Sequence, residues 1–420
     1  MRIPKLFAAV FLAMTSVALV ASPAAADEIR DREYWLTDYG IRQAWETTRG
    51  AGVTIAVIDT GIDGSHPDLV GAVIGGMDAS GIGSPDGQTP VGDDSSHGTL
   101  VASLLAGRGH GGDGLAGVIG VAPEANLLSV SVGFGGAGTR SSDDQIAEAV
   151  RWAVDNGADV INMSLTRNTL EWPESWDDAF LYAMNNDVVV VAAAGNRGAG
   201  TTVVGAPATM PGVVTVAGVD QRRQASEGAS SQGITISVAA PAERLVGAGP
   251  GNTYYEWEGS SGAAPIVSGL VALIRSAYPE LDAANVINRL IATASPVGSP
   301  VPSPLYGYGL IDARAAVTAS VDQVSANPMG DLADWIRVNR RADVVPSPNP
   351  IPAPESSAAP APQGPDDSAP VLPGLLGAAV PTVGSLRDVG IPIAVYIVFG
   401  TAVIVAVALW RRQVRRAIVG

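Results

Sequence analysis

The sequence predicts an α/β fold with a mostly parallel sheet and helices on both faces, followed by one transmembrane helix near the C-terminus. Between about residues 34 and 321, short β-branched or apolar runs alternate with longer helical stretches, and this alternation is typical of a parallel sheet covered by helices. A proline-rich stretch follows at residues 345–370. The third observation is an uncharged apolar segment of 20 residues at 391–410, which as a helix spans about 30 Å, the thickness of a bilayer core.

Residues 1–26 are typical of a secretory signal peptide. Arg2 and Lys5 precede the apolar residues 6–21, and three alanines at 24–26 fit a cleavage site. A short extension follows at residues 27–50, with no room for a folded prodomain. We expect the extension to pack on the next domain through four aromatic side chains, namely Tyr34, Trp35, Tyr39 and Trp45.

The central domain is expected at residues 51–321. Its predicted strands are near-continuous apolar runs, as in strands covered on both faces, and they lie at 53–59, 127–132, 159–165, 188–196 and 213–219. The 3.6-residue periodicity of 145–158 predicts a helix that stops at Gly157. A second helix is expected after residues 259–262 and should run to about residue 292.

Beyond the domain, residues 322–390 are expected to form a linker, which is rich in proline from about residue 345 and favours extended polyproline II. The apolar segment 391–410 is followed by the basic tail 411–420, with arginines at 411, 412, 415 and 416. Basic residues stay on the cytoplasmic side of a membrane. The chain is therefore expected to cross the cell membrane once, with a cytoplasmic C-terminus and an extracytoplasmic central domain.

Composition narrows the function classes. The chain has no cysteine, which excludes sites that need thiolate ligands and means that the fold is stable without disulfides. Its net charge of −16 argues against nucleic acid as a partner. Acidic loop residues lack the spacing of a calcium loop, so we expect no cofactor and no metal; they are Asp78, Asp86, Asp93, Asp94 and Asp113.

Candidate functional residues lie where predicted strands end or helices begin. Asp59 ends the first strand, His97 lies where a loop becomes an apolar helix, Asn196 ends a later strand, and Ser261 precedes another helix. Each residue alone also fits a turn or a helix cap. Together they are more informative, because ligands of parallel sheets bind beyond the carboxyl ends of the strands. The order Asp, His, Ser is also a known order of catalytic triads.

The other two of the three histidines are expected outside the site. His66 precedes a proline and is typical of a turn. His110 lies in a glycine-rich loop and is expected to be solvated.

Seven motifs resemble those of the subtilisin-like serine proteases and occur in the same order: VIDTGID, HPDL, HGTLVAS, INMSL, AAAGN, GSSGAAPIVSG and GYGLIDA. The resemblance implies a subtilisin-like three-layer α/β fold and a serine endopeptidase. It implies Ser261 as the nucleophile, His97 as the general base and Asp59 as the residue that orients the imidazole. It also implies that the side chain of Asn196 and the backbone N–H of Ser261 stabilise the oxyanion.

The resemblance also suggests walls of the substrate pocket, namely Ser164, Leu165, Thr166 and Gly195. The chain departs from the family at Ser260, which replaces Thr, at Gly262, which replaces Met or another larger residue, and at Ser103, which replaces Gly. Thr166 and Arg167 stand where many relatives have two glycines, which is expected to narrow specificity. Gly262 adds backbone freedom beside Ser261. None of these changes removes a catalytic group.

The order of segments is similar to that of the mycosins, membrane-anchored proteases attached to type VII secretion systems. This resemblance implies protein or peptide substrates among exported proteins, anchoring in the cytoplasmic membrane through 391–410 and association with the secretion machinery. The alternative is a mainly structural component of a membrane secretion complex, with weak or no proteolysis. Gly262 and the missing prodomain allow that alternative, whereas the presence of all the candidate catalytic groups favours an enzyme.

Overall fold

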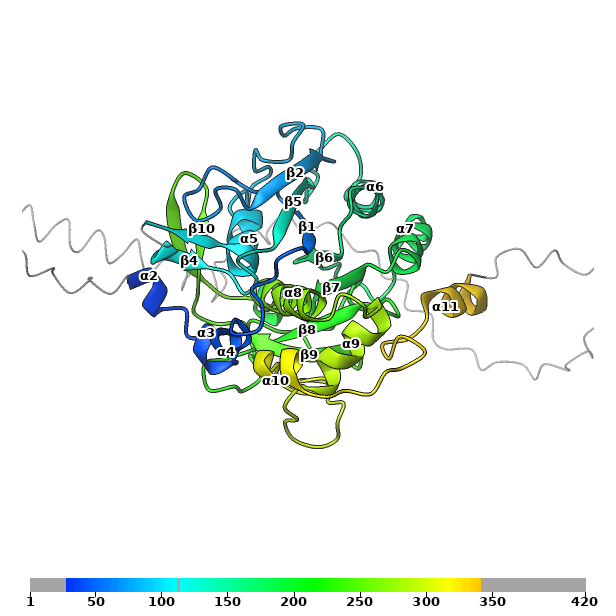
Figure 1. Ribbon diagram of the computed structural model, residues 1–420. Helices are drawn as coiled ribbons and strands as arrows, with labels where there is room; N and C mark the ends of the chain where they lie inside the picture. The colour runs from blue at the N-terminus through cyan, green and yellow to red at the C-terminus, as the bar shows by residue number, and fades with distance from the viewer. Residues whose placement is uncertain (1–27, 112–113, 341–420) are drawn as a thin grey trace, which may run out of the picture. The chain divides into compact units, whose positions relative to one another are not determined.

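The computed structural model describes residues 28–111 and 114–340 (Figure 1). The expected signal peptide, the proline-rich part of the linker, the transmembrane segment and the basic tail lie outside the described residues. The described part carries a seven-stranded sheet with the order β2-β5-β1-β6-β7-β8-β9, and every pairing within it is parallel. The predicted parallel α/β architecture is confirmed.

Five of the seven strands follow the predicted apolar runs to within three residues at either end, whereas β2 and β9 were not predicted. β1, β5, β6, β7, β8 and β9 are almost entirely buried, whereas the edge strand β2 is only partly buried. Central strands are buried on both faces because the helices on either side remove them from water. The bounds are β1 Thr54–Asp59, β2 Val73–Asp78, β5 Asn126–Ser131, β6 Val160–Met163, β7 Val189–Ala193, β8 Val214–Val219 and β9 Ile236–Pro241.

Helices cover both faces of the sheet (Figure 1). α5 (His97–Ala106) and α8 (Ser260–Ala277) pack together, and α8 contacts five of the strands. α6 (Ser142–Asp155) and α7 (Glu174–Asn185) pack against each other on the other face. The predicted stop of α6 is confirmed, because Gly157 has a φ of 77°, a left-handed conformation that favours glycine.

The helix after residue 259 is shorter than predicted. α8 ends at Ala277, and a separate helix, α9 (Ala283–Ala292), begins after Asp282, whose side chain accepts a hydrogen bond from the backbone N–H of Asn285. The apolar pattern continues through both helices, so periodicity alone did not reveal the break at Pro279. α8 is long and apolar enough to span a membrane, but 83% of it is buried inside the protein, as in a core helix.

The N-terminal extension packs on the central domain, as predicted. It forms α2 (Glu28–Asp31), α3 (Trp35–Asp38) and α4 (Ile41–Ala44), and Trp35 is fully buried in the main core. Arg30 donates hydrogen bonds to the carbonyls of Gly114, Ala116 and Gly117, which belong to the hairpin of β3 (Arg108–His110) and β4 (Ala116–Ile119). The extension is thus part of the folded unit.

The folded unit also continues past residue 321, where the sequence predicted the linker to begin. After α10 (Ala313–Thr318), α11 (Leu332–Asn339) packs against α7. Its Trp335 ring lies 4.3 Å from that of Trp172, and Arg340 Nε donates to Asp177 Oδ2 at 2.9 Å. This packing could not be read from residues 322–340 alone, because it joins two tryptophans that are distant in sequence.

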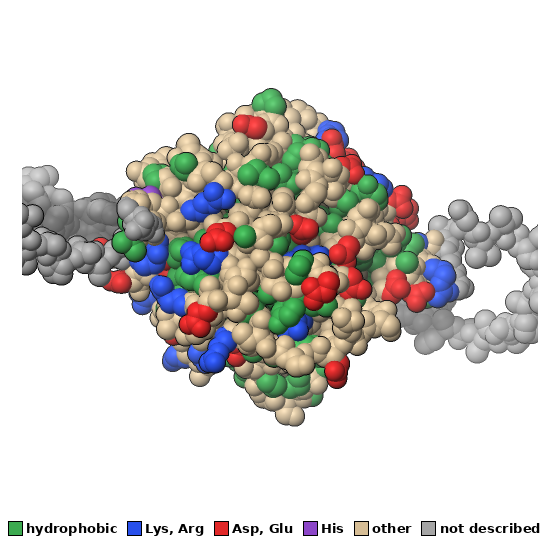
Figure 2. All heavy atoms as spheres, in the orientation of Figure 1, with side chains coloured by type: hydrophobic (Ala, Val, Ile, Leu, Met, Phe, Trp, Pro, Cys, Tyr) green, Lys and Arg blue, Asp and Glu red, His purple; other side chains and the backbone are tan. Residues whose placement is uncertain are grey.

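Charge is unevenly distributed over the face in Figure 2. Basic side chains gather around the N-terminal helices, and acidic side chains lie mainly toward α6 and α7.

Candidate active site

The carboxyl ends of three adjacent strands bring the candidate residues together. Asp59 is the last residue of β1, Ser164 directly follows β6, and Asn196 lies three residues beyond β7. Since β1, β6 and β7 are neighbours in a parallel sheet, their ends meet at one edge. His97 and Ser261 come to the same edge as the first residue of α5 and the second residue of α8.

Asp59 holds the imidazole of His97. Its Oδ1 atom lies 2.8 Å from His97 Nδ1, and the same oxygen accepts the backbone N–H of Thr60 at 2.7 Å. Asp59 is buried, whereas the His97 side chain is 20% exposed. The start of α5 approaches the end of β1 closely, because a Cβ on Gly98 would lie 2.3 Å from the carbonyl oxygen of Gly61. Glycine at position 98 therefore permits the close approach of the two backbones.

The surroundings of His97 favour its protonated form. Burial lowers the pKa of His97, but the charge and hydrogen bond of Asp59 and the charge of Asp94 outweigh burial, and the net result is a pKa raised above the usual 6.5. With Nδ1 directed at Asp59, Nε2 is the ring nitrogen left to exchange a proton with a substrate or a nucleophile.

Ser261 is held by Ser164. Ser164 Oγ donates to the carbonyl oxygen of Ser261 at 2.8 Å, and Ser261 Oγ donates to the carbonyl oxygen of Ser164 at 3.1 Å. The first bond replaces a missing helix bond, because Pro265, four residues after Ser261, has no N–H to donate. Ser164 also accepts from Asn162 Nδ2 at 3.1 Å. Ser164 therefore fixes the first turn of α8.

The amide of Asn196 is oriented by the residue before the candidate nucleophile. Asn196 Oδ1 accepts both the backbone N–H of Ser260 at 2.8 Å and its hydroxyl at 2.9 Å. The hydroxyl in turn accepts the N–H of Gly195 at 3.0 Å. Two donors fix Oδ1, so Nδ2 is the side of the amide that can donate to a bound group. Ser260 thus retains a hydroxyl where the family has threonine, and that hydroxyl positions Asn196.

His97, Asn196 and Ser261 line one cleft of about 410 Å³. Its other lining residues are Asp94, Ser96, Leu100, Tyr255, Glu256, Trp257 and Glu258. The cleft therefore combines three carboxylates with two aromatic rings. Within the described residues, no group of three or more His, Asp or Glu side chains is arranged to hold a metal.

The four candidate pocket residues do not line this cleft, although Ser164 contacts Ser261. Gly195 is buried with a φ of 96°, and a Cβ there would lie 2.5 Å from Thr201 Cγ2. Leu165 packs against the core, and Thr166 Oγ1 donates to the carbonyl of Arg167. The guanidinium of Arg167 pairs with Asp143.

Comparisons with known proteins agree with this arrangement. The model of the subtilase family matches residues 50–309. The chain belongs to the subtilase family. Among its relatives, Subtilisin DY of Bacillus licheniformis is 39% identical over 273 residues, which cover 64% of this chain and 92% of that protein.

Two solved structures resemble this subtilase along most of its described residues. MycP1 from Mycobacterium smegmatis has a TM-score of 0.59 and 29% identity, covering 72% of this chain and 88% of that chain. The MycP3 protease from the type VII (ESX-3) secretion system has a TM-score of 0.57 and 32% identity, covering 72% and 90%. The subtilase is a subtilisin-like serine endopeptidase, and its structural neighbours include mycosins.

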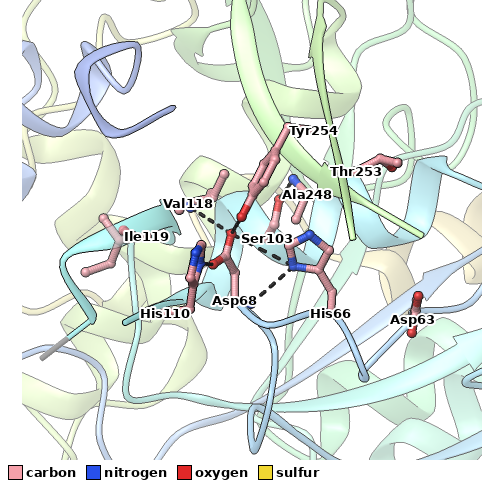
Figure 3. A network of polar contacts seen from close by, with 12 residues as sticks. Asp63, His66, Asp68, Ser103, His110, Val118, Ile119, Ala248, Thr253 and Tyr254 are labelled. Carbon is pink, nitrogen blue, oxygen red and sulfur yellow. Dashed lines mark hydrogen bonds and ion pairs between the residues drawn. The ribbon is translucent and has the colours of Figure 1, made fainter. Parts of the chain in front are cut away.

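Two features near the cleft were not predicted. The side chain of His110 is 40% exposed, but it is also paired, because its Nδ1 lies 2.6 Å from Oδ1 of the buried Asp68. Tyr254 donates to the other oxygen of Asp68 at 2.9 Å, and both side chains point at this carboxylate in Figure 3. His66 accepts the N–H of Asp68, as expected for a turn, but is also buried.

The second feature is Trp257, whose ring lies 5.9 Å from that of His97 at an interplanar angle of 75°. Its position four residues before Ser261 gave no signal, because strand and loop tryptophans are common core residues.

Proposed function

We propose that this subtilase is a membrane-anchored extracytoplasmic endopeptidase that cleaves exported proteins by Ser-His-Asp acyl-enzyme catalysis, as a mycosin-like component of a type VII secretion system. The observation that carries the catalytic part is the 2.8 Å contact between Asp59 and His97 at the edge of a cleft that also contains Ser261 and Asn196.

In the proposed mechanism, Ser261 Oγ attacks the carbonyl carbon of the scissile peptide while His97 Nε2 takes its proton. His97 then gives this proton to the leaving amine, the C–N bond breaks, and the acyl group stays on Ser261 as an ester. A water molecule, deprotonated by His97, hydrolyses the ester. Asp59 keeps the imidazole in the required tautomer and stabilises the imidazolium. The hydroxyl of Ser261 must first leave the Ser164 carbonyl and turn to His97.

Asn196 Nδ2 and the backbone N–H of Ser261 are the proposed donors to the oxyanion. Both suit this role, because the first N–H groups of a helix lack partners within the helix and Asn196 is held by Ser260. Because both donors are already in position, no reorganisation is needed when negative charge develops on the substrate oxygen.

The proposed location of the reaction is supported by the sequence and by similarity to solved structures. The predicted signal peptide and the segment 391–410 support anchoring with the catalytic domain outside. The likeness to the MycP3 protease from the type VII (ESX-3) secretion system supports association with such a system and therefore exported proteins as substrates.

The test uses a host that lacks this gene and expresses the full-length chain or its Ser261→Ala variant. We expect the wild type, but not Ser261→Ala, to restore cleavage of exported proteins, with the chain recovered in the membrane fraction. Full restoration of secretion and of cleavage by Ser261→Ala would contradict the proposal and favour a structural component. Recovery of the chain only in the medium would contradict the anchoring.

A further inference from the structure

We propose that Trp257 is a positioning residue for His97. We also propose that Gly262, which has no side chain, leaves the space that the indole of Trp257 occupies beside Ser261. The inference rests on the proposed catalytic function of His97. It accounts for the departure from the family at Gly262, directly after Ser261.

Two glycines form the slot in which the indole lies. A Cβ on Gly262 would lie 2.3 Å from Leu245 Cδ1 and 3.3 Å from Trp257 Cη2. A Cβ on Gly247 would lie 3.1 Å from Trp257 Nε1. The contact with Leu245 is shorter than real Cβ contacts, and the two contacts with the indole are tighter than most of them. Any larger residue at 262 would therefore displace Leu245 or the indole.

The hairpin that carries Trp257 is anchored to the helix of His97. β10 (Leu245–Gly249) pairs antiparallel with β11 (Thr253–Trp257), with Leu245 opposite Trp257. Ser103, a second departure from the family, lies in α5 and accepts the backbone N–H of Ala248 at 2.9 Å. β10 and the helix that begins with His97 are therefore held together directly.

The far end of the same hairpin is held by two carboxylates. Tyr254 donates to Asp68 Oδ2 at 2.9 Å, and the N–H of Gly251 donates to Asp63 Oδ2 at 2.9 Å. Figure 3 shows Tyr254 reaching from the hairpin to Asp68, with Ser103 and Ala248 close by. Because the hairpin is held at several points along its length, Trp257 is kept in a fixed position.

Trp257 and Asp59 hold the imidazole from two directions. Asp59 binds Nδ1, and the ring of Trp257 meets that of His97 in an edge-to-face arrangement, a geometry that aromatic pairs prefer. The hydrogen bond alone leaves the ring able to swing about the Nδ1–Oδ1 direction. The indole restricts that swing and shields one side of the ring from water, so Nε2 keeps its direction into the cleft.

A positioning role and a role as a wall for substrate predict different kinetics. A misplaced catalytic group lowers kcat, and a displacement of about 1 Å can cost about 100-fold. Loss of a wall that binds substrate and transition state equally raises KM with kcat unchanged. Tyr255 is a matched control, because it lies on the same strand and lines the same cleft without a ring contact to His97 among the described aromatic pairs.

The experiment compares the full-length wild type with Trp257→Ala, Trp257→Phe and Tyr255→Ala, using kcat and KM on a peptide substrate from pH 5 to 9. We expect Trp257→Ala to lower kcat at least about tenfold with KM within about threefold, and Trp257→Phe to recover most of the loss. In Trp257→Ala, water reaches His97 and stabilises the imidazolium, so the pKa of His97 should rise and the acid limb of kcat/KM should move to higher pH. The nearby carboxylates, which also favour the imidazolium, are unchanged in this variant; they are Asp59, Asp94, Glu256 and Glu258. Tyr255→Ala should leave the acid limb in place.

A second readout does not depend on activity. With three histidines in the chain, the NMR signal of His97 can be assigned by its loss in His97→Gln and titrated in each variant. An upward shift of its pKa in Trp257→Ala, but not in Tyr255→Ala, supports the positioning role even in a chain that cleaves no peptide, where the catalytic proposal itself would fail. An unchanged titration, or a raised KM with unchanged kcat, would overturn the inference.

Discussion

Ser164 and Ser261 hold each other through two reciprocal hydrogen bonds, in which each hydroxyl donates to the other's carbonyl oxygen. The arrangement follows from Pro265, which leaves the carbonyl of Ser261 without a donor inside α8. A predicted wall of the substrate pocket is thus also a support for the proposed nucleophile.

Replacing Ser164 by alanine should affect both stability and rate. The Ser261 carbonyl is partly buried, and a fully buried carbonyl without a donor costs about 1–3 kcal/mol, so we expect the free energy of unfolding to fall by up to that amount in urea titrations. We also expect kcat to fall, because the first turn of α8 loses its support. Ser164→Thr, which keeps the hydroxyl, is the control. Equal kcat values for Ser164→Ala and wild type would show that Ser261 does not need this support.

Replacing Asp59 by asparagine should slow the reaction without unfolding the protein. We expect kcat to fall by about 10⁴, as in triads where the carboxylate that sets the tautomer is lost. Circular dichroism checks that the fold is retained. A loss of less than tenfold would mean that Asp59 does not orient the catalytic base.

The pH dependence of kcat/KM follows from the raised pKa of His97. The neutral imidazole is the active base, so activity should be lost as pH falls through a pKa above 6.5 and should be full at higher pH. The Asp59 charge raises this pKa, and in Asp59→Asn the residual activity should therefore have its acid limb at lower pH. A limb that moved to higher pH would contradict the assigned cause.

Asn196→Ala should lower kcat by about 10²–10³, the typical effect of losing one donor to the oxyanion. KM should change little, because the donor acts mainly in the transition state. Steady-state kinetics on one peptide substrate give both constants. Ser260→Thr keeps the hydroxyl that orients Asn196 and should retain nearly full activity. If Asn196→Ala raised KM alone, Asn196 would be a substrate-binding residue.

Replacing Arg30 by glutamine should destabilise the whole folded unit. Arg30 Nε lies 2.9 Å from the fully buried carboxylate of Glu33, and the guanidinium also donates to three backbone carbonyls. Leaving a buried acceptor without its donor costs about 1–3 kcal/mol, so we expect a loss of at least that size. Urea titration measures the loss. Arg32→Gln is the control, because its partner Glu28 is mostly exposed and such pairs contribute about 1 kcal/mol or less. Similar losses in both variants would show that Arg30 is not a structural anchor.

Much of the fold was predictable because parallel strands buried on both faces leave a strong sequence pattern. The runs ending at Asp59 and near Asn196 also placed two candidate residues at the correct edge of the sheet. Seven motifs supplied the family, and the structure explains two departures from it, since Ser260 orients Asn196 and Ser103 anchors β10.

Other contacts could not be predicted, because they join residues far apart in the chain. The pairing of His110 with Asp68 spans 42 positions, and the contact between the rings of Trp335 and Trp172 extends the folded unit beyond residue 321. Trp257 carried no signal in the sequence. The position of its ring depends on Gly247 and Gly262, which together leave room for the indole.

The measurement that tests the central claim most directly is covalent labelling with a fluorophosphonate, which reacts with activated serine hydroxyls. The full-length chain is labelled in detergent, digested and mapped by mass spectrometry, alongside the Ser261→Ala, His97→Ala and Ser260→Ala variants. We predict one label, on Ser261, that is abolished in Ser261→Ala, strongly slowed in His97→Ala and still present in Ser260→Ala. Labelling that persists in Ser261→Ala, or that is mapped to Ser260, would contradict the assignment of Ser261 as the nucleophile.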